Sequence, residues 1–311
     1  MSCAYQSGVL HMIYRGRFAP SPTGPLHFGS LVAAVGSYLQ AKSMGGQWLI
    51  RIEDLDTPRC VAGAADAILH ALESLGFEWD DSVLYQSTRN AAYAAALEQL
   101  RSLNLCYPCS CSRSELLAAD PASDGEEIRY PGWCRNGPRK DQGEHAWRFK
   151  VPVRPVQFHD VIHGALHVDL SESIGDFVIK RRDGLFAYQL AVVVDDAAQG
   201  ITEVVRGVDL LLNTPRQIVL QQMLHLPTPG YVHLPLVKDA QGRKLSKSDS
   251  APDVSCHLSG QAASQLLWHA LDFLRQSPPL ELKDAALPDI WKWSIRNWQL
   301  QTLIYSRSTW A

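Results

Sequence analysis

The sequence predicts an α/β fold, in which a parallel sheet is interrupted by an insertion and followed by a small helical tail. Three observations carry this prediction. A strand, loop, helix and strand follow one another near the start, alternating elements return after a cysteine-rich stretch, and helix formers dominate after residue 255. With 311 residues, 46% of them hydrophobic, the chain can bury a sizeable core. We expect an N-terminal extension (1–13), a core (14–255) that carries the insertion (about 106–150), and a helical domain (256–311).

The first unit consists of a strand, a loop, a helix and a second strand. Residues 15–19 are strand-like, and the prolines of PSPTGP (20–25) then require a loop, because proline neither continues a strand nor starts an unbroken helix. A helix of small and apolar residues is expected from His27 to the glycine pair at 45–46, and QWLIRIED (47–54) is typical of a buried strand. Such units bind ligands at the carboxyl ends of their strands, so the loop before His27 is the expected site.

Later segments continue the alternation. Helical character is expected at 61–75 and 89–104, and short strands with turns at 147–170. Further alternating elements are FAYQLAVVVDD (186–196), ITEVVRGVDL (201–210) and the helix-like TPRQIVLQQMLHL (214–226). In the tail, QAASQLLWHALDFLRQ (261–276) is the clearest amphipathic helix. Tail tryptophans are expected to anchor its core, although they could instead stack on bases; they are Trp291, Trp293, Trp298 and Trp310.

Composition limits location and partners. No apolar run approaches 18 residues and the start lacks a secretory signal, so we expect a cytoplasmic protein that does not enter a membrane. Either Met1 or Met12 can be the true start. The formal charge of −3 is no global signature of nucleic-acid binding, so any RNA contact must use local basic patches. Candidate phosphate contacts, with a solvated charged face as the equal alternative, are Arg135, Arg139, Lys140, Lys180, Arg181 and Arg182.

Seven cysteines is an odd number, and four of them lie between residues 106 and 134. This crowding favours a reduced compartment and a metal site over disulfides. Cys109, Cys111 and Cys134 are a credible set of zinc thiolates, although the single residue between the first two is tighter than the usual finger spacing. Cys106 and His145 are candidates for a fourth ligand, and four buried or free thiols are the alternative to a metal site.

Two segments carry the chemistry: PSPTGPLHFGS (20–30), which enters the first helix, and KLSKS (244–248) in a polar loop. A loop that enters a helix offers free N–H groups and a positive dipole end, which suit the phosphates of ATP, and Gly29 allows close approach. His27 is expected to donate to the α-phosphate during carboxylate attack, and Lys244 and Lys247 to close over the β- and γ-phosphates. Taken singly, a helix-start histidine and solvated lysines are the commoner interpretations.

Together, these segments resemble the paired HIGH and KMSKS signatures of class I aminoacyl-tRNA synthetases, and RFAPSPTGPLHFGSL (17–31) with RIEDLDTPR (51–59) points to the glutamyl branch. The resemblance runs from about residue 15 to 249. It implies a Rossmann-type nucleotide-binding core, ATP with Mg²⁺, and activation of L-glutamate to glutamyl-adenylate. Ser30 replaces the second histidine of the motif and Phe28 its isoleucine, so we expect weaker dependence on position 30 and not lost chemistry.

The resemblance also implies the two halves of the substrate site. Glutamate needs a cation for its side-chain carboxylate and an anion for its α-ammonium, and Arg17 and Arg206 are the expected cations and Glu53 the anion. The alternative places Glu53 in a surface pair with Arg51 or Arg59. The implied glutamate pocket is lined by Arg17, Phe18, Ala19, Pro20, Ser21, Glu53, Tyr188 and Arg206, and the implied ATP site by Pro20, Gly24, His27, Gly29, Ser30 and Lys247.

Only 63 residues follow Ser248, where full-length members of the branch carry large anticodon-reading domains. The chain resembles shortened members, in which a tyrosine four residues before the last cysteine completes a structural zinc site; Tyr130 matches that place. Those members transfer glutamate to the queuosine base in the anticodon of tRNA-Asp, so a tRNA-Asp anticodon stem-loop is the implied partner and a monomer the implied state. The alternatives are a shortened glutamyl-tRNA synthetase that charges a 3′ end and a non-catalytic RNA-binding paralogue.

Overall fold

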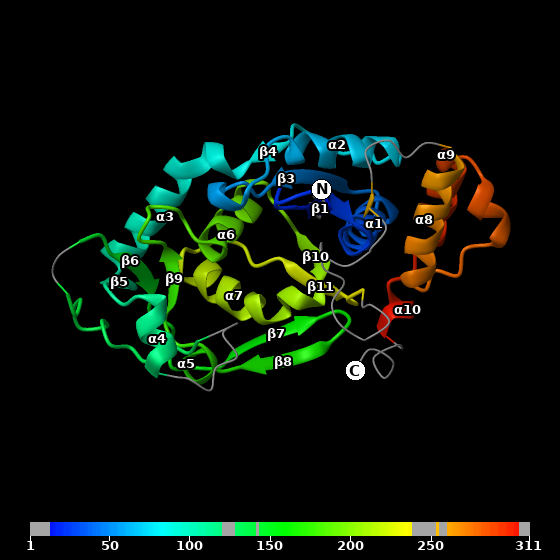
Figure 1. Cartoon of the computed structure of the whole chain (residues 1–311). Coiled ribbons are helices and arrows are strands. Elements are labelled where there is room, and N and C mark those ends of the chain that lie inside the picture. The colour runs from blue at the N-terminus through cyan, green and yellow to red at the C-terminus, as the bar shows by residue number, and fades with distance from the viewer. Residues whose placement is uncertain (1–12, 120–127, 141–142, 238–252, 255–259, 305–311) are drawn as a thin grey trace, which may run out of the picture.

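The computed structural model describes residues 13–119, 128–140, 143–237, 253–254 and 260–304 (Figure 1). Most of the predicted N-terminal extension, Trp310 and both candidate catalytic lysines, Lys244 and Lys247, lie outside these residues. Among the helices described, none is long and apolar enough to cross a membrane.

The first predicted unit is confirmed. β1 (Arg15–Phe18) pairs in parallel with β3 (Gln47–Ile52), and β3 pairs in parallel with β4 (Leu84–Tyr85). Between β1 and β3, α1 (Phe28–Ser43) follows the proline loop and buries its small and apolar residues against the sheet. Gly45 lies directly beyond this helix at a φ of +64°, a conformation that glycine adopts without strain.

The second half of the sheet comes from the later alternating segments. α6 (Tyr188–Ala198) precedes β10 (Glu203–Gly207), and α7 (Thr214–Met223) precedes β11 (Gly230–Leu234), which pairs with β10 in parallel. β1 and β10 lie side by side, since the Thr202 N–H donates to the Arg15 carbonyl over 2.9 Å. The spatial order β4, β3, β1, β10, β11 is a doubly wound parallel arrangement, which confirms the predicted α/β class.

The predicted insertion is a separate antiparallel layer. β5 (Cys106–Cys109), β6 (Ala146–Phe149) and β9 (Phe177–Lys180) form one sheet, so this layer takes in residues beyond position 150. The hairpin of β7 (Val156–Asp160) and β8 (Gly164–Val168) joins the main sheet where Asp160 pairs with Tyr231 of β11. Four more helices precede β9 in the chain: α2 (Ala64–Ser74), α3 (Asn90–Ser102), α4 (Arg113–Ala119) and α5 (Leu170–Ser173).

The tail is helical, as predicted, and packs beside α1 (Figure 1). Trp291 is buried, with its ring 4.7 Å from that of Tyr38 and its Nε1 donating to the Leu75 carbonyl over 2.9 Å. Trp298 is partly buried and donates to Gln40 Oε1, and Trp293 is partly buried as well. Core packing is therefore confirmed for Trp291. The tail helices are α8 (Gln261–Phe273), α9 (Leu287–Asn297) and α10 (Gln301–Ile304).

Short elements complete the connections. β2 (Leu26–His27) pairs antiparallel with β12 (Asp253–Val254), which brings residue 253 opposite His27. Short 3₁₀ helices occur at Thr57–Arg59, Gln86–Arg89, Val208–Asn213 and Leu280–Asp284.

Candidate active site and metal centre

A cavity of about 460 Å³ opens at the carboxyl ends of β1, β10 and β11, beside the N-terminus of α1. This is the expected position for a ligand in a doubly wound sheet. We call it the active-site cavity. Every predicted substrate residue that the structure describes lines its wall: Arg17, Phe18, Ala19, Pro20, Ser21, Gly24, His27, Gly29, Ser30, Glu53, Tyr188 and Arg206.

His27 caps α1 at the cavity. Its Nδ1 accepts the Ser30 N–H over 3.2 Å, and its Nε2 lies 3.0 Å from Ser30 Oγ. Because Nδ1 is an acceptor, the neutral ring carries its proton on Nε2, the nitrogen that faces Ser30 Oγ. A Cβ on Gly29 would lie 3.2 Å from this ring, so glycine there leaves the histidine room. Ser30, expected to matter little, contacts both ring nitrogens.

Arg17 and Glu53 belong to a buried charge network. Asp196 Oδ1 accepts from Arg17 Nε over 3.2 Å and from Arg51 Nη1 over 2.8 Å, and Arg51 Nη2 lies 3.4 Å from Glu53 Oε1. Burial raises the pKa of the Glu53 carboxyl. Burial opposes ionisation of Asp196 as well, but Arg17 and Arg51 outweigh it and lower the pKa of that carboxyl. Glu53 thus pairs with Arg51, as the alternative predicted, but at the cavity wall and not on the surface.

Arg206 is held differently from Arg17. Its guanidinium donates to four acceptors: His233 Nε2 at 3.0 Å, the Tyr188 hydroxyl at 3.2 Å, Thr214 Oγ1 at 2.8 Å and the Leu210 carbonyl at 3.4 Å. All four are uncharged, because burial lowers the pKa of His233 to about 4. Among the residues that the structure describes, Arg206 has no carboxylate partner. Its positive charge is therefore available to an anionic ligand in the active-site cavity.

Four polar residues around the cavity were not singled out from the sequence as site residues in their own right: Arg51, Asp160, Asp196 and His233. Asp196 and His233 carry a local signal, since each is a polar residue inside a mainly apolar segment, VVVDDAA and GYVHL. Such residues stay buried only when they are paired. Their partners lie far away in sequence, so the signal indicates that a network exists without naming its members.

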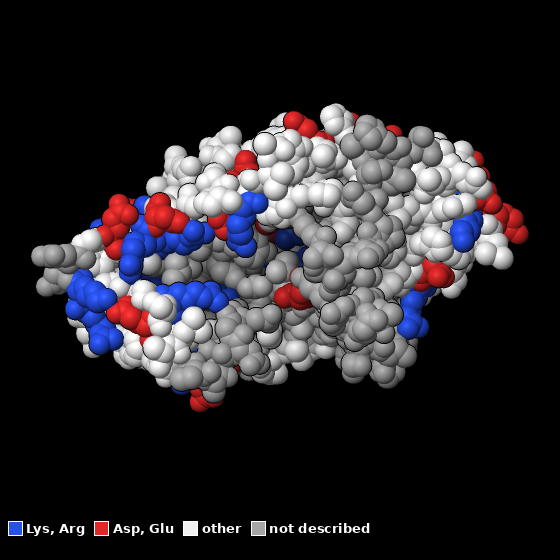
Figure 2. Space-filling model, in the orientation of Figure 1, with Lys and Arg blue, Asp and Glu red and all other residues white. Residues whose placement is uncertain are grey.

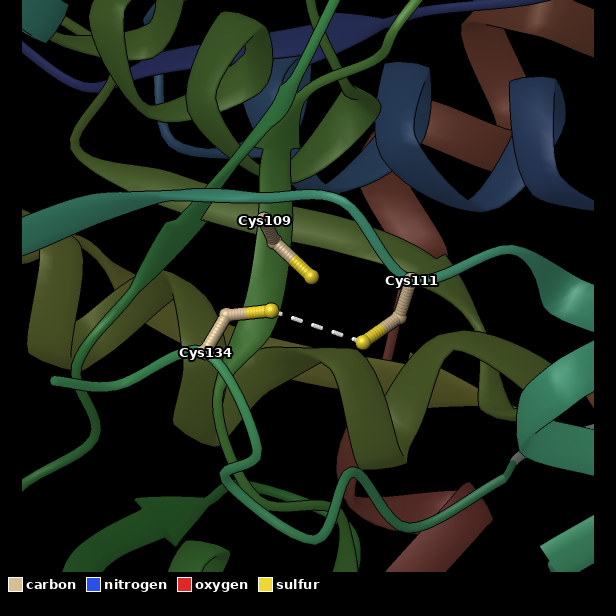
Figure 3. Close-up of side chains that lie close together, drawn as sticks. All are labelled: Cys109, Cys111 and Cys134. Carbon is tan, nitrogen blue, oxygen red and sulfur yellow. Dashed lines mark hydrogen bonds between the residues drawn. The ribbon is translucent and has the colours of Figure 1, made fainter. Parts of the chain in front are cut away.

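The side chains of Cys109, Cys111 and Cys134 converge, coming from β5 and the two loops beyond it (Figure 3). Their sulfur atoms all lie within 4.8 Å of one another, with 3.5 Å between those of Cys111 and Cys134. Tetrahedral zinc with Zn–S bonds of about 2.3 Å separates neighbouring sulfurs by about 3.8 Å. The donor set and spacing therefore fit a metal ion of this kind.

Tyr130 is the best placed of the three candidates for a fourth ligand. Its hydroxyl lies 3.4 Å from Cys109 Sγ and 3.7 Å from Cys111 Sγ, and accepts the Cys134 N–H over 2.9 Å. Cys106 packs into a different hydrophobic core, and Nε2 of the partly buried His145 bonds to the Lys140 carbonyl. We call Cys109, Cys111, Cys134 and Tyr130 the cysteine cluster.

Ionisation in the cysteine cluster is uneven. Burial raises the pKa of the Cys111 thiol to about 11 and also raises the pKa of Tyr130. Burial opposes ionisation of Cys134 too, but backbone N–H groups of Arg139 and Ser110 outweigh it and lower its pKa to about 6. A bound cation would supply the electrostatic attraction that Cys111 and Tyr130 need in order to ionise.

Comparison with known proteins identifies the family. Residues 14–262 match the family described as "tRNA synthetases class I (E and Q), catalytic domain". The chain belongs to this family. Its catalytic domain is that of a ligase, and the active-site cavity lies within the matched residues.

Relatives over nearly the whole chain carry one name. A glutamyl-Q tRNA(Asp) synthetase of Thiobacillus denitrificans is 52% identical over 288 residues, covering 93% of this chain and 94% of the relative. Another, of Geobacter sulfurreducens, is 54% identical over 287 residues, covering 91% of each. A solved glutamate-tRNA synthetase of Elizabethkingia anophelis is similar with a TM-score of 0.77 at 26% identity, covering 93% of this chain. The chain spans 66% of that longer protein.

Proposed function

We propose that this chain activates L-glutamate with ATP and transfers the glutamyl group to the queuosine base at the anticodon wobble position of tRNA-Asp. The observation that carries the first half is the active-site cavity, which combines a helix N-terminus capped by His27 with Arg206, whose guanidinium has no carboxylate partner among the described residues. The second half rests on the name that relatives at 52% and 54% identity share.

In the first step, an α-carboxylate oxygen of glutamate attacks the α-phosphorus of ATP, and pyrophosphate leaves as the mixed anhydride forms. The side-chain carboxylate would meet Arg206 and the Tyr188 hydroxyl, while Glu53 attracts the α-ammonium. His27 donates from Nε2 to the α-phosphate oxygens as charge builds there. No protein nucleophile is required, because the substrate supplies the attacking oxygen.

Mg²⁺ bound with ATP would neutralise charge on the β- and γ-phosphates. The same task is proposed for Lys244 and Lys247. Support comes from the described residues that flank residues 238–252: Val237 lines the active-site cavity, and residue 253 pairs with His27. In the second step, a hydroxyl of the queuosine diol attacks the adenylate carbonyl carbon, and AMP leaves.

We further propose one structural Zn²⁺ held by Cys109, Cys111, Cys134 and Tyr130. No residue of this cluster lines the active-site cavity, so the ion has no proposed part in the chemistry. It would hold the layer of β5, β6 and β9 together. Elemental analysis of unchelated protein is expected to find one zinc per chain, and a value well under one would exclude the site.

The acceptor is the tRNA-Asp anticodon stem-loop in this proposal. Figure 2 shows Lys and Arg side chains gathered at the end of the molecule where β5, β6 and α4 lie, and such a patch suits RNA phosphates. Several candidate contacts also have internal partners: Arg182 donates to the Ser110 carbonyl, Arg181 pairs with Asp56, and Lys140 pairs with Glu115. Because tRNA, ATP and reduced thiols occur together in the cytoplasm, we propose that location.

The first test is exchange of pyrophosphate into ATP, measured without tRNA and with glutamate, glutamine or aspartate. Exchange with glutamate alone supports activation and the pocket. Labelled glutamate is then offered to tRNA-Asp with and without queuosine, and the product is mapped by RNase digestion. Label in the anticodon fragment of the queuosine-containing tRNA alone supports the proposed acceptor. Label at the 3′ end would favour a shortened glutamyl-tRNA synthetase. Absence of any labelled product would favour a non-catalytic paralogue.

A further inference from the structure

The polar chain behind Arg206 begins at Asp160, which has no exposed surface. Its Oδ1 accepts the N–H groups of Ile162 and His163, at 3.0 and 2.8 Å, and its Oδ2 lies 2.7 Å from Nδ1 of His233, which is also fully buried. Burial opposes ionisation of Asp160, but His233 and the His163 N–H outweigh it and lower the pKa of this carboxyl. The ionised carboxylate can only accept hydrogen bonds. His233 must therefore carry its proton on Nδ1.

That proton position determines what His233 offers to Arg206. With Nδ1 as the donor, Nε2 carries a lone pair and accepts the Arg206 Nε–H over 3.0 Å, with Thr214 Oγ1 3.2 Å away on the same nitrogen. The opposite tautomer would bring two donors face to face. The fold sets this contact, because Arg206 and His233 are register partners on the parallel strands β10 and β11, and Asp160 ends β7 beside Tyr231 of β11.

The orientation of the guanidinium decides which donors face the ligand. His233, Thr214 and the Leu210 carbonyl take up Nε and Nη2, and the Tyr188 hydroxyl accepts from Nη1. Within the described residues, one N–H on Nη1 and the hydroxyl hydrogen of Tyr188 then remain as a pair of donors at the cavity wall. A carboxylate can accept from both, whereas a side-chain amide would turn its own NH₂ toward one of them or leave a donor unpaired.

We propose that His233, held in a single tautomer by Asp160, is a positioning residue that orients Arg206 and thereby sets the preference for glutamate over glutamine. The inference rests on the proposed function, because it assigns Arg206 to the side-chain carboxylate. Neither His233 nor Asp160 lines the active-site cavity, so both act through Arg206.

Three substitutions separate the bond of His233 to Asp160 from its bond to Arg206. Asp160→Asn keeps the oxygen that accepts the backbone N–H groups but turns an NH₂ toward Nδ1 of His233. The imidazole proton must then move to Nε2, where it faces the Nε–H of Arg206. His233→Gln sets an amide oxygen near the former Nε2 and can still accept from Arg206. His233→Asn sets its amide near the former Nδ1 and loses Arg206. Tyr93→Phe is the matched control, since it removes a buried 2.7 Å bond to Asp195 away from the active-site cavity.

Pyrophosphate exchange gives KM and kcat for each variant. We expect Asp160→Asn and His233→Asn to raise the KM for glutamate roughly tenfold to a hundredfold, as loss of a hydrogen bond to a charged group does. The difference in KM between glutamate and glutamine should therefore become smaller. His233→Gln and Tyr93→Phe should stay near wild type, and the KM for ATP should not move. Equal effects of the Gln and Asn variants, or an unchanged KM for glutamate, would overturn the proposal.

Two further measurements keep the outcomes distinct. If the wild type shows no exchange with any amino acid, the proposed function fails, and the glutamate preference assigned to His233 fails with it. If the wild type exchanges with glutamate and the variants match it, only the role of His233 fails. Histidine-selective ¹⁵N NMR of the wild type reads the tautomer directly: a proton on Nδ1 of His233 is expected, and a proton on Nε2 would refute the relay even if Asp160→Asn does not fold.

Discussion

The charged side chains of the active-site cavity are held by partners from distant parts of the chain, whereas the polar atoms of the cysteine cluster lie mainly against one another. Arg206 donates to residues of α6, β11 and the start of α7. In the cysteine cluster, Cys111 Sγ lies 3.5 Å from Cys134 Sγ and 3.7 Å from the Tyr130 hydroxyl. Burial there raises the pKa of Cys111 to about 11.

The difference concerns what each region needs in order to keep its shape. The cavity wall is supported by two large hydrophobic cores and by hydrogen bonds among its own side chains that form without a substrate. The cysteine cluster rests on a small core, in which Tyr107 and Leu116 are the other buried residues. A core of that size offers little hydrophobic stabilisation, so the cluster should depend on a metal ion and the cavity should not.

The largest expected effect follows removal of a metal ligand. Cys134→Ser should lower zinc content well below one per chain and destabilise the layer of β5, β6 and β9 by several kcal/mol, because binding energy of structural zinc is folding energy. Elemental analysis and limited proteolysis measure this. Glutamate-dependent exchange should change little, and Cys60→Ser, a cysteine outside the cluster, should change neither property. Equal loss of exchange and of zinc would break the distinction between the regions.

A smaller effect is expected in the active-site cavity. Arg206→Lys keeps the positive charge but cannot donate to His233, Thr214 and Tyr188 together. We expect kcat/KM for glutamate to fall roughly a hundredfold to a thousandfold, about 3 to 4 kcal/mol, with zinc content unchanged. Arg101→Lys, at an exposed pair with Glu98, is the control. A fall of less than threefold would show that Arg206 does not hold the substrate.

The pH dependence of stability should reveal the buried histidine. The pKa of His233 is about 4 in the folded chain and 6.5 in the unfolded chain, and the groups around it are Asp160, Arg206 and His163. Between these two pH values His233 is protonated in the unfolded chain and neutral in the folded chain. The free energy of unfolding therefore falls as the pH drops from 6.5 toward 4. Between pH 7 and 5 this amounts to about 2 kcal/mol. Urea unfolding of the wild type should show this loss, and His233→Gln should show less; identical curves would contradict the assignment.

The smallest effect is expected next to the cysteine cluster. Arg148 donates from Nε to Cys109 Sγ over 3.3 Å, and its guanidinium lies 3.8 Å from the centre of the Tyr130 ring. Arg148→Lys should weaken zinc binding roughly tenfold, because residues that contact metal ligands tune their basicity. Chelator competition measures the affinity. Arg129→Lys, one residue from Tyr130 but bonded to the Ser171 carbonyl, should leave it unchanged.

Much of the cavity could be predicted from the sequence because its motifs are local. The prolines of 20–25, His27 at the start of α1 and Gly45 at its end each act on their own backbone, and the structure has these elements where they were expected. The same local pattern carries the resemblance that named Arg17, Glu53, Tyr188 and Arg206, all of which line one wall. The roles assigned to them stay predictions.

Local sequence patterns therefore specify which short segments form strands, loops and helices and which of them carry polar side chains toward a ligand. The partners of these side chains are selected by the folded chain: Asp196 joins Arg17 to Arg51, Asp160 sets the tautomer of His233, and Tyr130 reaches the thiols while Cys106 packs elsewhere. The reason is physical. A buried charge must be paired, but the pair is selected by strand register and by the meeting of elements up to 179 residues apart, and neither leaves a local trace.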